Sequence, residues 1–318
     1  MSMSTFHQLQ TAFPDLNWES NVRLEPFTYM KIGGPAEVLW QARNLDELRE
    51  VVQFVRQQDI ELTVLGGASN VVIDDAGLSG LVIINRCEGL LVEDGALIAE
   101  SGVKTGMLVR YSVDQGFAGL EPFLGVPGTL GGAIFNNAHY TNELIGNFVD
   151  SVEVVDLSGE SKWLTQAECG FSYDHSRFHA SGEIILQVRF RLQRGDATIS
   201  QELIKETTVK RATTQPLGTA NSGCMFQNVQ LSPEEQLRFG GKATLPAGWL
   251  IDQAGLKGAR VGNVVVSDKH ANFMINTGDA TSHDVQALVK KIQTEVQKTF
   301  GLKLEPEVFF LGTTEQKG

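Results

Sequence analysis

The sequence predicts a chain of mixed α and β structure that is built from more than one domain. Three observations support this prediction: a length of 318 residues, a strand–helix–strand pattern over residues 36–65, and a change of pattern near residue 208. Domains commonly contain about 100 to 200 residues, so the length alone favours two or three of them. Apolar residues make up 42% of the chain and charged residues 20%, which is typical of a globular protein with a sizeable core.

The first part of the chain alternates strand and helix. The segment "AEVLWQA" (36–42) predicts a buried strand, and Asn44 with Glu47 three residues later predicts the start of an amphipathic helix. The segment "ELTVL" (61–65) predicts a second strand, which ends in the loop "GGASN" (66–70). A dinucleotide fingerprint opens a helix, whereas the residues that follow here, "VVIDD", predict a strand. The loop therefore needs another explanation.

The middle of the chain, roughly residues 88–207, also mixes helix and strand. It predicts a strand near 96–101 and a helix near 105–115 that ends at Gly116. Two longer apolar segments, "SVEVVDL" and "EIILQVRFRL", predict further strands.

From about residue 208 the pattern changes. The segments "SGCMFQNV", "NVVVS" and "ANFMIN" predict strands, and "AGWLIDQAGL" predicts a short helix. Thr281 and Asp284 predict a capping box at the start of a longer helix, and Gly301 predicts its end. We therefore expect three domains, with the boundaries 1–87, 88–207 and 208–318.

The charge balance and the N-terminus restrict the partners and the location of the protein. The net charge is −12, from 38 acidic and 26 basic residues, so there is no basic stripe for nucleic acid. The N-terminal segment lacks the pattern of a signal peptide, and no apolar stretch of about 18 residues occurs. We expect a cytoplasmic protein with no nucleic-acid or membrane partner. Cys87, Cys169 and Cys224 are an odd number at wide spacing, which predicts neither a disulfide framework nor a metal site.

A second loop is rich in glycine. The segment "LGVPGTLGGAIFNNA" (124–138) places four glycines and one proline within its first nine residues. Glycine lets a large ligand lie against the main chain, and proline fixes the direction of the backbone. A tight loop without a ligand uses the same residues, so the pattern alone leaves both explanations open.

Six segments taken together resemble one known family. They are "KIGGPAEVLW" (31–40), "VLGGASNVVI" (64–73), "LEPFLGVPGTLGGAIFNNA" (120–138), "SGCMFQN" (222–228), "GNVVVSDKHANFMINTGDAT" (262–281) and "LEPEVFFLG" (304–312). In this order they resemble the UDP-N-acetylenolpyruvoylglucosamine reductases, the MurB family of flavoenzymes, from about residue 20 to the C-terminus. The resemblance implies a two-part FAD-binding domain of the vanillyl-alcohol oxidase type, followed by an α+β substrate domain.

The resemblance also implies FAD and NADPH as cofactors. In the family the two glycine loops wrap the FAD pyrophosphate, because main-chain N–H groups in concave turns bind an anion without a cationic side chain. The FAD-binding residues implied here are Gly66, Gly67, Ala68, Ser69, Asn70, Pro127, Gly128, Gly131 and Gly132.

The reaction implied is reduction of the enolpyruvyl ether of UDP-N-acetylenolpyruvoylglucosamine to UDP-N-acetylmuramate, a precursor of peptidoglycan. Negative charge develops beside the substrate carboxylate, so the site needs donors aimed at that group and an acid that protonates the carbon. A monomer whose partners are the substrate and NADPH is expected.

Two residues match the family's catalytic positions. Cys224 stands where the family has a serine or cysteine proton donor, and an ordinary thiol is mostly protonated at neutral pH. The alternative is a buried cysteine that only fills space. Glu307, in "LEPEV", matches the glutamate that polarises the carboxylate region, and the alternative is a solvated glutamate at a strand end.

The chain departs from the family where an arginine usually follows a tyrosine and acts on the carboxylate. Here Tyr173 is followed by Asp174, which cannot do this. Arg177, three residues later, is the candidate replacement, since its guanidinium forks onto carboxylates and Asp174 could hold it by pairing. The alternative is a surface cation that only pairs with Asp174.

Substrate contacts are expected from Tyr173 and from Asn228, whose amide matches a residue at the uridine diphosphate. Thr214 stands where many relatives have a cation, so diphosphate contacts differ. Two other functions stay open: a related FAD-dependent alcohol or sugar oxidase, and an impaired nucleotide-sugar binding protein, which Asp174 would favour.

Overall fold

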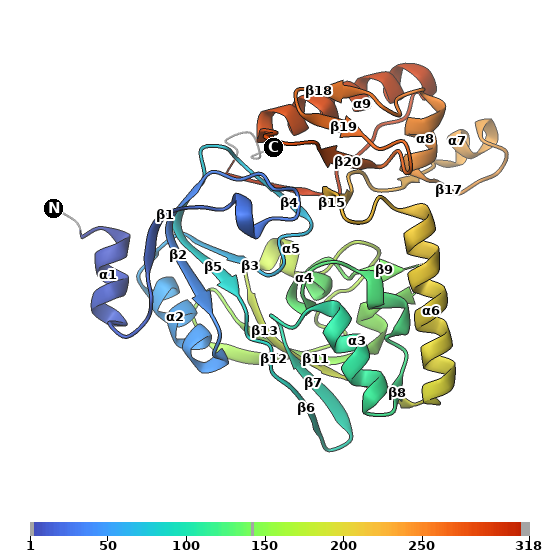
Figure 1. Ribbon diagram of the computed structural model, residues 1–318. Coiled ribbons are helices and arrows are strands. Elements are labelled where there is room, and N and C mark those ends of the chain that lie inside the picture. The colour runs from blue at the N-terminus through green and yellow to red at the C-terminus, as the bar shows by residue number, and fades with distance from the viewer. Residues whose placement is uncertain (1–2, 141–142, 313–318) are drawn as a thin grey trace. The chain divides into compact units, whose positions relative to one another are not determined.

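The computed structural model describes residues 3–140 and 143–312, which divide into two compact units (Figure 1). Unit 1 comprises Met1–Val22, Ala36–Ala68 and Ser79–Arg211, and unit 2 comprises Arg23–Pro35, Ser69–Leu78 and Ala212–Gly318. Two short segments of the first 87 residues thus belong to unit 2. The domain boundaries expected at residues 87 and 207 stay predictions.

Unit 1 contains a four-stranded sheet covered by helix α2 (Leu45–Gln57) (Figure 1). Its strands, in spatial order, are β1 (Glu19–Arg23), β2 (Pro35–Ala42), β5 (Leu78–Asn85) and β3 (Leu62–Leu65). The buried face of α2 packs on Val38 and Trp40 of β2 and on Leu81 of β5. The side chain of Asn44 accepts from the N–H groups of the first turn, so the predicted start of this helix is confirmed. Helix α1 (Thr5–Ala12) precedes the sheet.

A second, antiparallel sheet in unit 1 carries the larger core. Its strands, in spatial order, are β12 (Ser161–Thr165), β11 (Val149–Val155), β13 (Ile184–Phe190), β7 (Ala96–Glu100) and β6 (Leu90–Glu93). Buried residues of α3 (Thr105–Asp114), α4 (Leu130–Phe135) and α5 (Phe178–Ser181) belong to the same cluster as those of the sheet. The strands and the helix expected near 96–115 are confirmed, and the helix ends before Gly116, whose φ is +73°.

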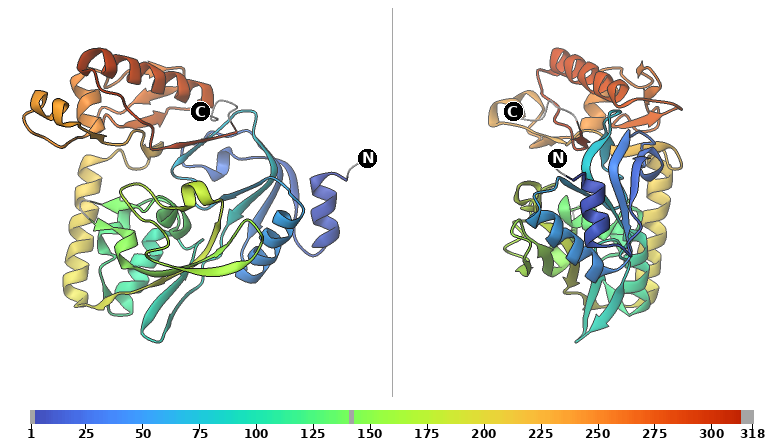
Figure 2. Two further views of the ribbon diagram at one scale, coloured as in Figure 1. Left: turned by 180° about the vertical axis from the view of Figure 1, so that it is seen from behind. Right: turned by 90° about the vertical axis from the view of Figure 1, so that its left-hand side faces the viewer.

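Helix α6 (Ala197–Thr214), which Figure 2 shows as one continuous helix, is not predicted by the sequence pattern. Its apolar residues Ile199, Leu203 and Val209 are exposed, and its only buried residues are Ser200 and Arg211. Without an apolar stripe the helical period is hidden. The short elements of unit 1 are η2 (Glu121–Gly125), η3 (Ile145–Phe148), β8 (Phe117–Ala118), β9 (His139–Tyr140), β10 (Glu143–Leu144) and β14 (Gln193–Arg194).

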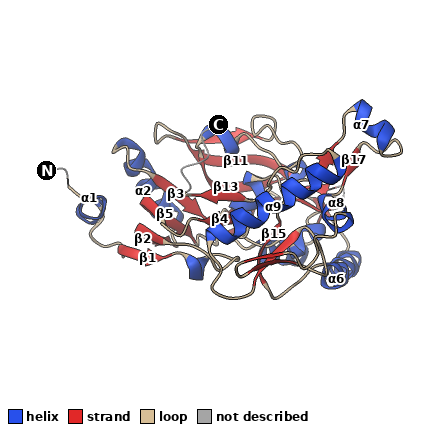
Figure 3. Ribbon diagram, turned by 90° about the horizontal axis from the view of Figure 1, so that it is seen from above, coloured by secondary structure: helices blue, strands red, loops and turns tan. Residues whose placement is uncertain are grey.

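Unit 2 has a four-stranded antiparallel sheet and two packed helices. The strands, in spatial order, are β15 (Ala220–Cys224), β20 (Phe273–Asn276), β19 (Val264–Val266) and β18 (Arg260–Val261). Helix α8 (Ala247–Gln253) packs beside α9 (Ser282–Phe300) (Figure 3). The remaining elements are η1 (Glu25–Phe27), β16 (Val229–Gln230), α7 (Pro233–Arg238), β17 (Thr244–Leu245) and the parallel pair β4 (Val71–Ile73) and β21 (Phe309–Leu311).

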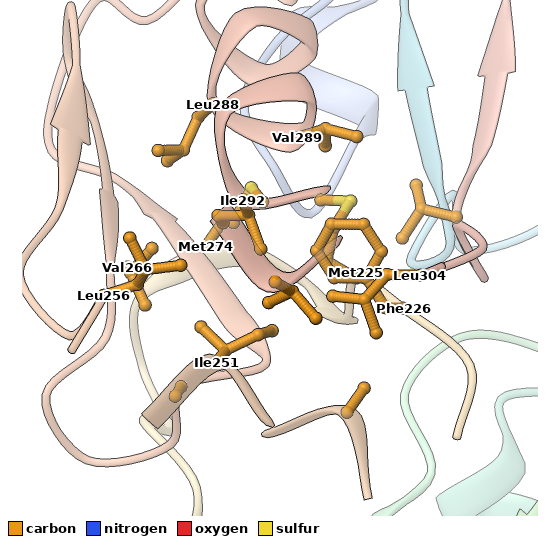
Figure 4. Packing of buried hydrophobic residues seen from close by; sticks show 14 of the residues in the cluster. Met225, Phe226, Ile251, Leu256, Val266, Met274, Leu288, Val289, Ile292 and Leu304 are labelled. Carbon is orange, nitrogen blue, oxygen red and sulfur yellow. The ribbon is translucent and has the colours of Figure 1, made fainter. Parts of the chain in front are cut away.

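The core of unit 2 forms under α9 (Figure 4). Leu288, Val289 and Ile292 of this helix share one buried cluster with Met225 and Met274. Both hydrogen bonds of the predicted capping box at the start of α9 are present, and Gly301 ends the helix in the left-handed region. The predicted start and end of this helix are therefore confirmed.

Within the two described stretches of chain, we find no helix with both the length and the apolar character needed to cross a membrane.

Candidate active site

The two glycine loops of unit 1 lie against each other, main chain to main chain. A Cβ atom added to Gly67 would lie 2.5 Å from the Cα of Gly128, and one added to Gly66 would overlap the Thr129 hydroxyl. Gly128 itself has a φ of +99°, which side-chain-bearing residues rarely adopt. Glycine is therefore required at these positions by the approach of the loops alone, whatever ligand they bind.

Other features of the loops fit a bound group. A Cβ added to Gly132 meets no atom of the described chain within 4 Å, so packing within the protein does not explain the absence of a side chain there. The Thr129 hydroxyl is buried and has no hydrogen-bond partner among the described residues. Ala68 adopts a φ of +48°, a strained angle for a residue with a Cβ. A backbone without side chains, next to a buried hydroxyl, suits a bound phosphate group such as that of FAD.

Some of the predicted FAD-binding residues make hydrogen bonds within the protein. The N–H of Gly131 donates to the carbonyl of Ser101 (2.8 Å), so its contribution to a ligand site is close packing and not an N–H. Asn70 lies in unit 2, where its Nδ2 donates to the carbonyl of Glu307 (3.1 Å). For all of the predicted residues, Ser69 and Pro127 included, the FAD contact stays a prediction.

Cys224 lies at the end of β15, beyond an irregularity in the sheet. The register between β15 and β20 shifts between Asn221 and Cys224, and Gly223 within the shift has a φ of +79°. The side chain of Asn221 accepts from the N–H of Gly223 (2.9 Å), which fixes the shift. A bulge of this kind re-aims the following side chain and is frequent beside active sites.

The three thiols differ in environment. Cys87 and Cys169 are fully buried, and burial raises the pKa of each to about 12. Cys224 is half-buried. Its exposure is that of a thiol able to meet a ligand, whereas the other two only fill space.

The structure brings Cys224 and Glu307 onto paired segments of unit 2. The N–H of Glu307 donates to the carbonyl of Met225 (2.8 Å), the residue directly after Cys224. Asn272, which is buried, bonds through its side chain to both the N–H (3.0 Å) and the carbonyl (2.8 Å) of Phe226. Glu305, the neighbouring acid, is exposed and pairs with Lys303 (2.6 Å). The geometry thus favours Glu307 over Glu305 as the functional acid.

Sequence reasoning did not single out Asn272, and it missed one bond of Asn228. The side-chain oxygen of Asn228 accepts from the N–H of Ala247 (3.1 Å), the first residue of α8. This bond fixes the amide in place beside the helix start. Contact of Asn228 with the uridine diphosphate stays a prediction.

The predicted pairing of Arg177 with Asp174 is wrong. The guanidinium donates from Nη2 to Glu183 (3.1 Å) and from Nη1 to the carbonyl of Glu168 (3.1 Å). Glu183 is almost fully buried and also pairs with Lys162 (3.2 Å), so it attracts nearby cations strongly. The role of Arg177 at the substrate carboxylate stays a prediction.

Asp174 pairs instead with His139, which the sequence offers only as one of several possible ligand contacts. Its Oδ1 lies 2.7 Å from Nδ1 of His139, and the hydroxyl of Tyr173 lies 3.3 Å from Nε2 of the same ring. The rings of His139 and Tyr173 contact each other with centroids 4.6 Å apart and planes tilted by 39°. The available signal was the acid at position 174, where the family usually has an arginine.

Comparison with known proteins matches both halves of the chain. A family model described as UDP-N-acetylenolpyruvoylglucosamine reductase, C-terminal domain, matches residues 215–311, and one described as FAD binding domain matches residues 36–165. The family resemblance and the predicted fold class are thereby confirmed.

Relatives of the same name cover nearly the whole chain. The UDP-N-acetylenolpyruvoylglucosamine reductase of Carboxydothermus hydrogenoformans is 37% identical over 296 residues, 92% of this chain and 93% of the relative. That of Latilactobacillus sakei is 33% identical over 311 residues, 98% of both chains. The crystal structure of UDP-N-acetylenolpyruvylglucosamine reductase (MurB) from Thermus caldophilus superposes with a TM-score of 0.75 at 30% identity, covering 93% of this chain and 98% of that one. The chain belongs to the UDP-N-acetylenolpyruvoylglucosamine reductase (MurB) family.

Proposed function

We propose that the protein reduces the enolpyruvyl ether of UDP-N-acetylenolpyruvoylglucosamine to UDP-N-acetylmuramate, with NADPH as the electron source. The observation that carries this proposal is the family match over nearly the whole chain, together with a half-buried cysteine and a glutamate on segments whose main chains pair. FAD, when bound, supplies hydride transfer to the substrate.

The glycine loops of unit 1 are the part of the chain that would hold FAD. Gly66, Gly67 and Gly128 let the two backbones approach, and the buried Thr129 hydroxyl offers a polar atom in the same place. The strained Ala68 also belongs to this surface. The loops position the cofactor without a cationic side chain, through main-chain dipoles.

Cys224 is proposed as the proton donor. After hydride has reached the terminal carbon of the enolpyruvyl group, the adjacent carbon requires a proton, and the Sγ–H group supplies it. The bulge at Gly223 fixes the direction of this side chain, and Asn272 holds the segment that follows. The thiolate that results regains its proton from water.

Glu307, Arg177, Tyr173 and Asn228 are proposed to act on the substrate. The main chain of Glu307 pairs with the residue that follows Cys224, and its carboxyl would polarise the carboxylate region. Arg177 would offset the charge that develops on the carboxylate, while Tyr173 and Asn228 would bind the substrate. Removal of one aimed donor from a water-poor site typically costs about 3–4 kcal/mol of transition-state stabilisation.

The relatives favour the reductase over the alternatives. An oxidase would use the same glycine loops, but the C-terminal match to the reductase family would then have no purpose. An impaired binding protein would require that the change at Asp174 abolish the reaction, whereas Cys224 and Glu307 are both retained. We further propose a monomeric enzyme in the cytoplasm that serves peptidoglycan synthesis.

One experiment separates the three functions. Purified holoenzyme is mixed with NADPH without oxygen, and the visible absorbance of the flavin is followed before and after enolpyruvyl substrate is added. The reductase bleaches with NADPH, regains colour with the substrate, and yields UDP-N-acetylmuramate by mass spectrometry. Bleaching by an alcohol or sugar instead of NADPH, with colour regained from oxygen, would indicate an oxidase, and bleaching by neither would indicate a binding protein. Light scattering of the same sample tests the monomer.

A further inference from the structure

We propose that Asp174, His139 and Tyr173 form a hydrogen-bonded chain that presents the Tyr173 hydroxyl as a donor to the substrate carboxylate. His139, protonated on both nitrogens, is the positioning residue in this chain. The proposal rests on the proposed function, because that function supplies a ligand with a carboxylate. It assigns His139 and Asp174 a role that neither the family match nor the sequence gives them.

The three hydrogen-bonded side chains run from the buried interior to the surface. The Asp174 side chain is 7% exposed, that of His139 is 27% exposed, and Tyr173 is 44% exposed. An ionised carboxylate only accepts hydrogen bonds, so Nδ1 of His139 carries the hydrogen of the 2.7 Å contact. Contact between the rings of His139 and Tyr173 holds the Tyr173 hydroxyl within 3.3 Å of Nε2 of His139. The exposed end is thus the end able to meet a ligand.

Burial of Asp174 favours the protonated imidazole. Its Oδ2 atom is buried without a hydrogen-bond partner in the described chain, and Arg177, the cation nearest in sequence, is bonded to Glu183. A buried carboxylate is costly unless a positive charge lies beside it. His139 is the group in contact with Asp174 that can take this charge.

The protonation of His139 decides the direction of the Tyr173 hydrogen. When Nε2 carries a hydrogen, it donates to the phenolic oxygen, and the phenolic hydrogen points to another acceptor. When Nε2 has lost its hydrogen, it becomes the acceptor, and the hydroxyl turns inward to the ring. Donation to the substrate therefore requires the protonated imidazole and is lost as the pH rises.

Other titratable groups lie on the elements around β9. One is Glu143, which lies opposite Tyr140 in the β9–β10 pair. Another is Glu121 of η2, whose carboxylate accepts from the N–H of Gly119 (2.6 Å) and from the hydroxyl of Ser200. Lys210 and Arg211 of α6 lie over the ring of Tyr140, and the rings of His175 and His179 meet 4.9 Å apart. Asp174 is in direct contact with the imidazole, so its removal is the most informative change.

Two ligands isolate the carboxylate. UDP-N-acetylmuramate carries it and UDP-N-acetylglucosamine lacks it, so the ratio of their dissociation constants with the holoenzyme, measured by calorimetry, reports donation to this group without turnover. Tyr173→Phe is expected to weaken binding of UDP-N-acetylmuramate about 10- to 100-fold, as for loss of a hydrogen bond to a charged group. Binding of UDP-N-acetylglucosamine is expected to stay unchanged. His139→Asn is expected to act in the same direction.

The pH dependence separates this role from a merely structural one. In wild type the preference for UDP-N-acetylmuramate is expected to fall as pH rises through the deprotonation of His139. Asp174→Asn removes the negative charge beside the ring, so the fall is expected to move to lower pH. His175→Asn changes an exposed histidine next to Asp174 and is the matched control, expected to behave as wild type.

The outcomes test this inference and the proposed function on which it rests. If Tyr173→Phe and Asp174→Asn retain both the preference and its pH dependence, the chain of three residues has no such role. If wild type shows no preference for the carboxylate-bearing ligand, the proposed function fails and this inference fails with it. Because Tyr173 is exposed, its phenylalanine variant is expected to fold, and flavin content and circular dichroism verify this.

Discussion

Asn70 joins one of the glycine loops to the segment that carries Glu307. Its Nδ2 donates to the carbonyl of Glu307 (3.1 Å), and its own carbonyl accepts from the N–H of Phe309 (3.0 Å). The second bond starts the parallel pair of β4 with β21. One side chain thus holds the end of the "GGASN" loop and the proposed acid in a single piece of unit 2.

Replacement of Asn70 by alanine is expected to affect two properties. Loss of the hydrogen bond costs about 1 kcal/mol of unfolding free energy, and a looser Glu307 slows reoxidation of the flavin by the substrate more than reduction by NADPH. Thermal melting and rapid-mixing kinetics measure these effects. Asn263→Ala removes an exposed asparagine that bonds the carbonyl of Asp279 (3.5 Å), and it serves as control. Equal half-reaction rates in Asn70→Ala and wild type would contradict the link.

Gly132 and Gly67 provide a contrast that tests the FAD site. Gly132→Ala places a methyl group where the described chain has no atom within 4 Å, in a helix that favours alanine. We expect flavin-free protein to keep or raise its melting temperature while flavin affinity falls. Gly67→Ala meets the Gly128 backbone and is expected to lower both. Full flavin occupancy in Gly132→Ala would show that FAD does not contact this position.

Thiol labelling tests whether Cys224 is the accessible cysteine. The pKa values of about 12 keep Cys87 and Cys169 protonated at pH 9, and a protonated thiol is a poor nucleophile. Iodoacetamide at that pH is expected to modify Cys224 alone in folded protein and all three cysteines in denaturant, with peptide mass spectrometry as the readout. Bound UDP-N-acetylmuramate is expected to slow the reaction. Modification of Cys87 in folded protein would contradict the burial argument.

Cys224→Ala is expected to separate the two half-reactions. Only protonation of carbon needs the thiol, so flavin reduction by NADPH keeps its rate while reoxidation by the substrate slows by about 100-fold or more. Cys224→Ser restores much of the rate, since a hydroxyl also donates. Cys87→Ala, a change in the core, is the control: it lowers the melting temperature and leaves reoxidation unchanged. Wild-type reoxidation in Cys224→Ala would mean that the proton comes from another group.

Sequence reasoning succeeded where the local pattern and the fold agree. The helix starts at Asn44 and Thr281 and the buried strand at 36–42 follow from capping and periodicity, and the structure confirms them. The glycine loops stand out in the composition, and at Gly66, Gly67 and Gly128 the close main-chain approach and the backbone angle require glycine.

The remaining features depend on contacts between distant residues. The bond from Asn70 to Glu307 joins positions 237 residues apart, and the pair of His139 with Asp174 joins positions 35 apart. No local pattern encodes such contacts. Arg177 shows the same difficulty: sequence proximity favoured Asp174 as its partner, whereas in the structure Arg177 pairs with Glu183 and Asp174 with His139.

Arg177 therefore requires a test that separates catalysis from pairing. If Arg177 acts on the substrate carboxylate, Arg177→Ala slows flavin reoxidation by the substrate much more than flavin reduction by NADPH. Arg177→Lys restores only part of the reoxidation rate, because lysine lacks the forked geometry of the guanidinium. If it serves only to neutralise Glu183, both half-reactions keep their rates and the melting temperature falls, because a buried carboxylate loses a partner.

A second change distinguishes these effects further. Glu183→Gln in the Arg177→Ala background removes the unpaired charge, so a stability defect is expected to recover while a catalytic defect is not. Lys162, which also pairs with Glu183, stays in place in both variants. We expect reoxidation to stay slow in the double variant, as the role at the carboxylate predicts. Recovery of both the melting temperature and the reoxidation rate would assign Arg177 to the pair with Glu183 and leave the carboxylate to other donors.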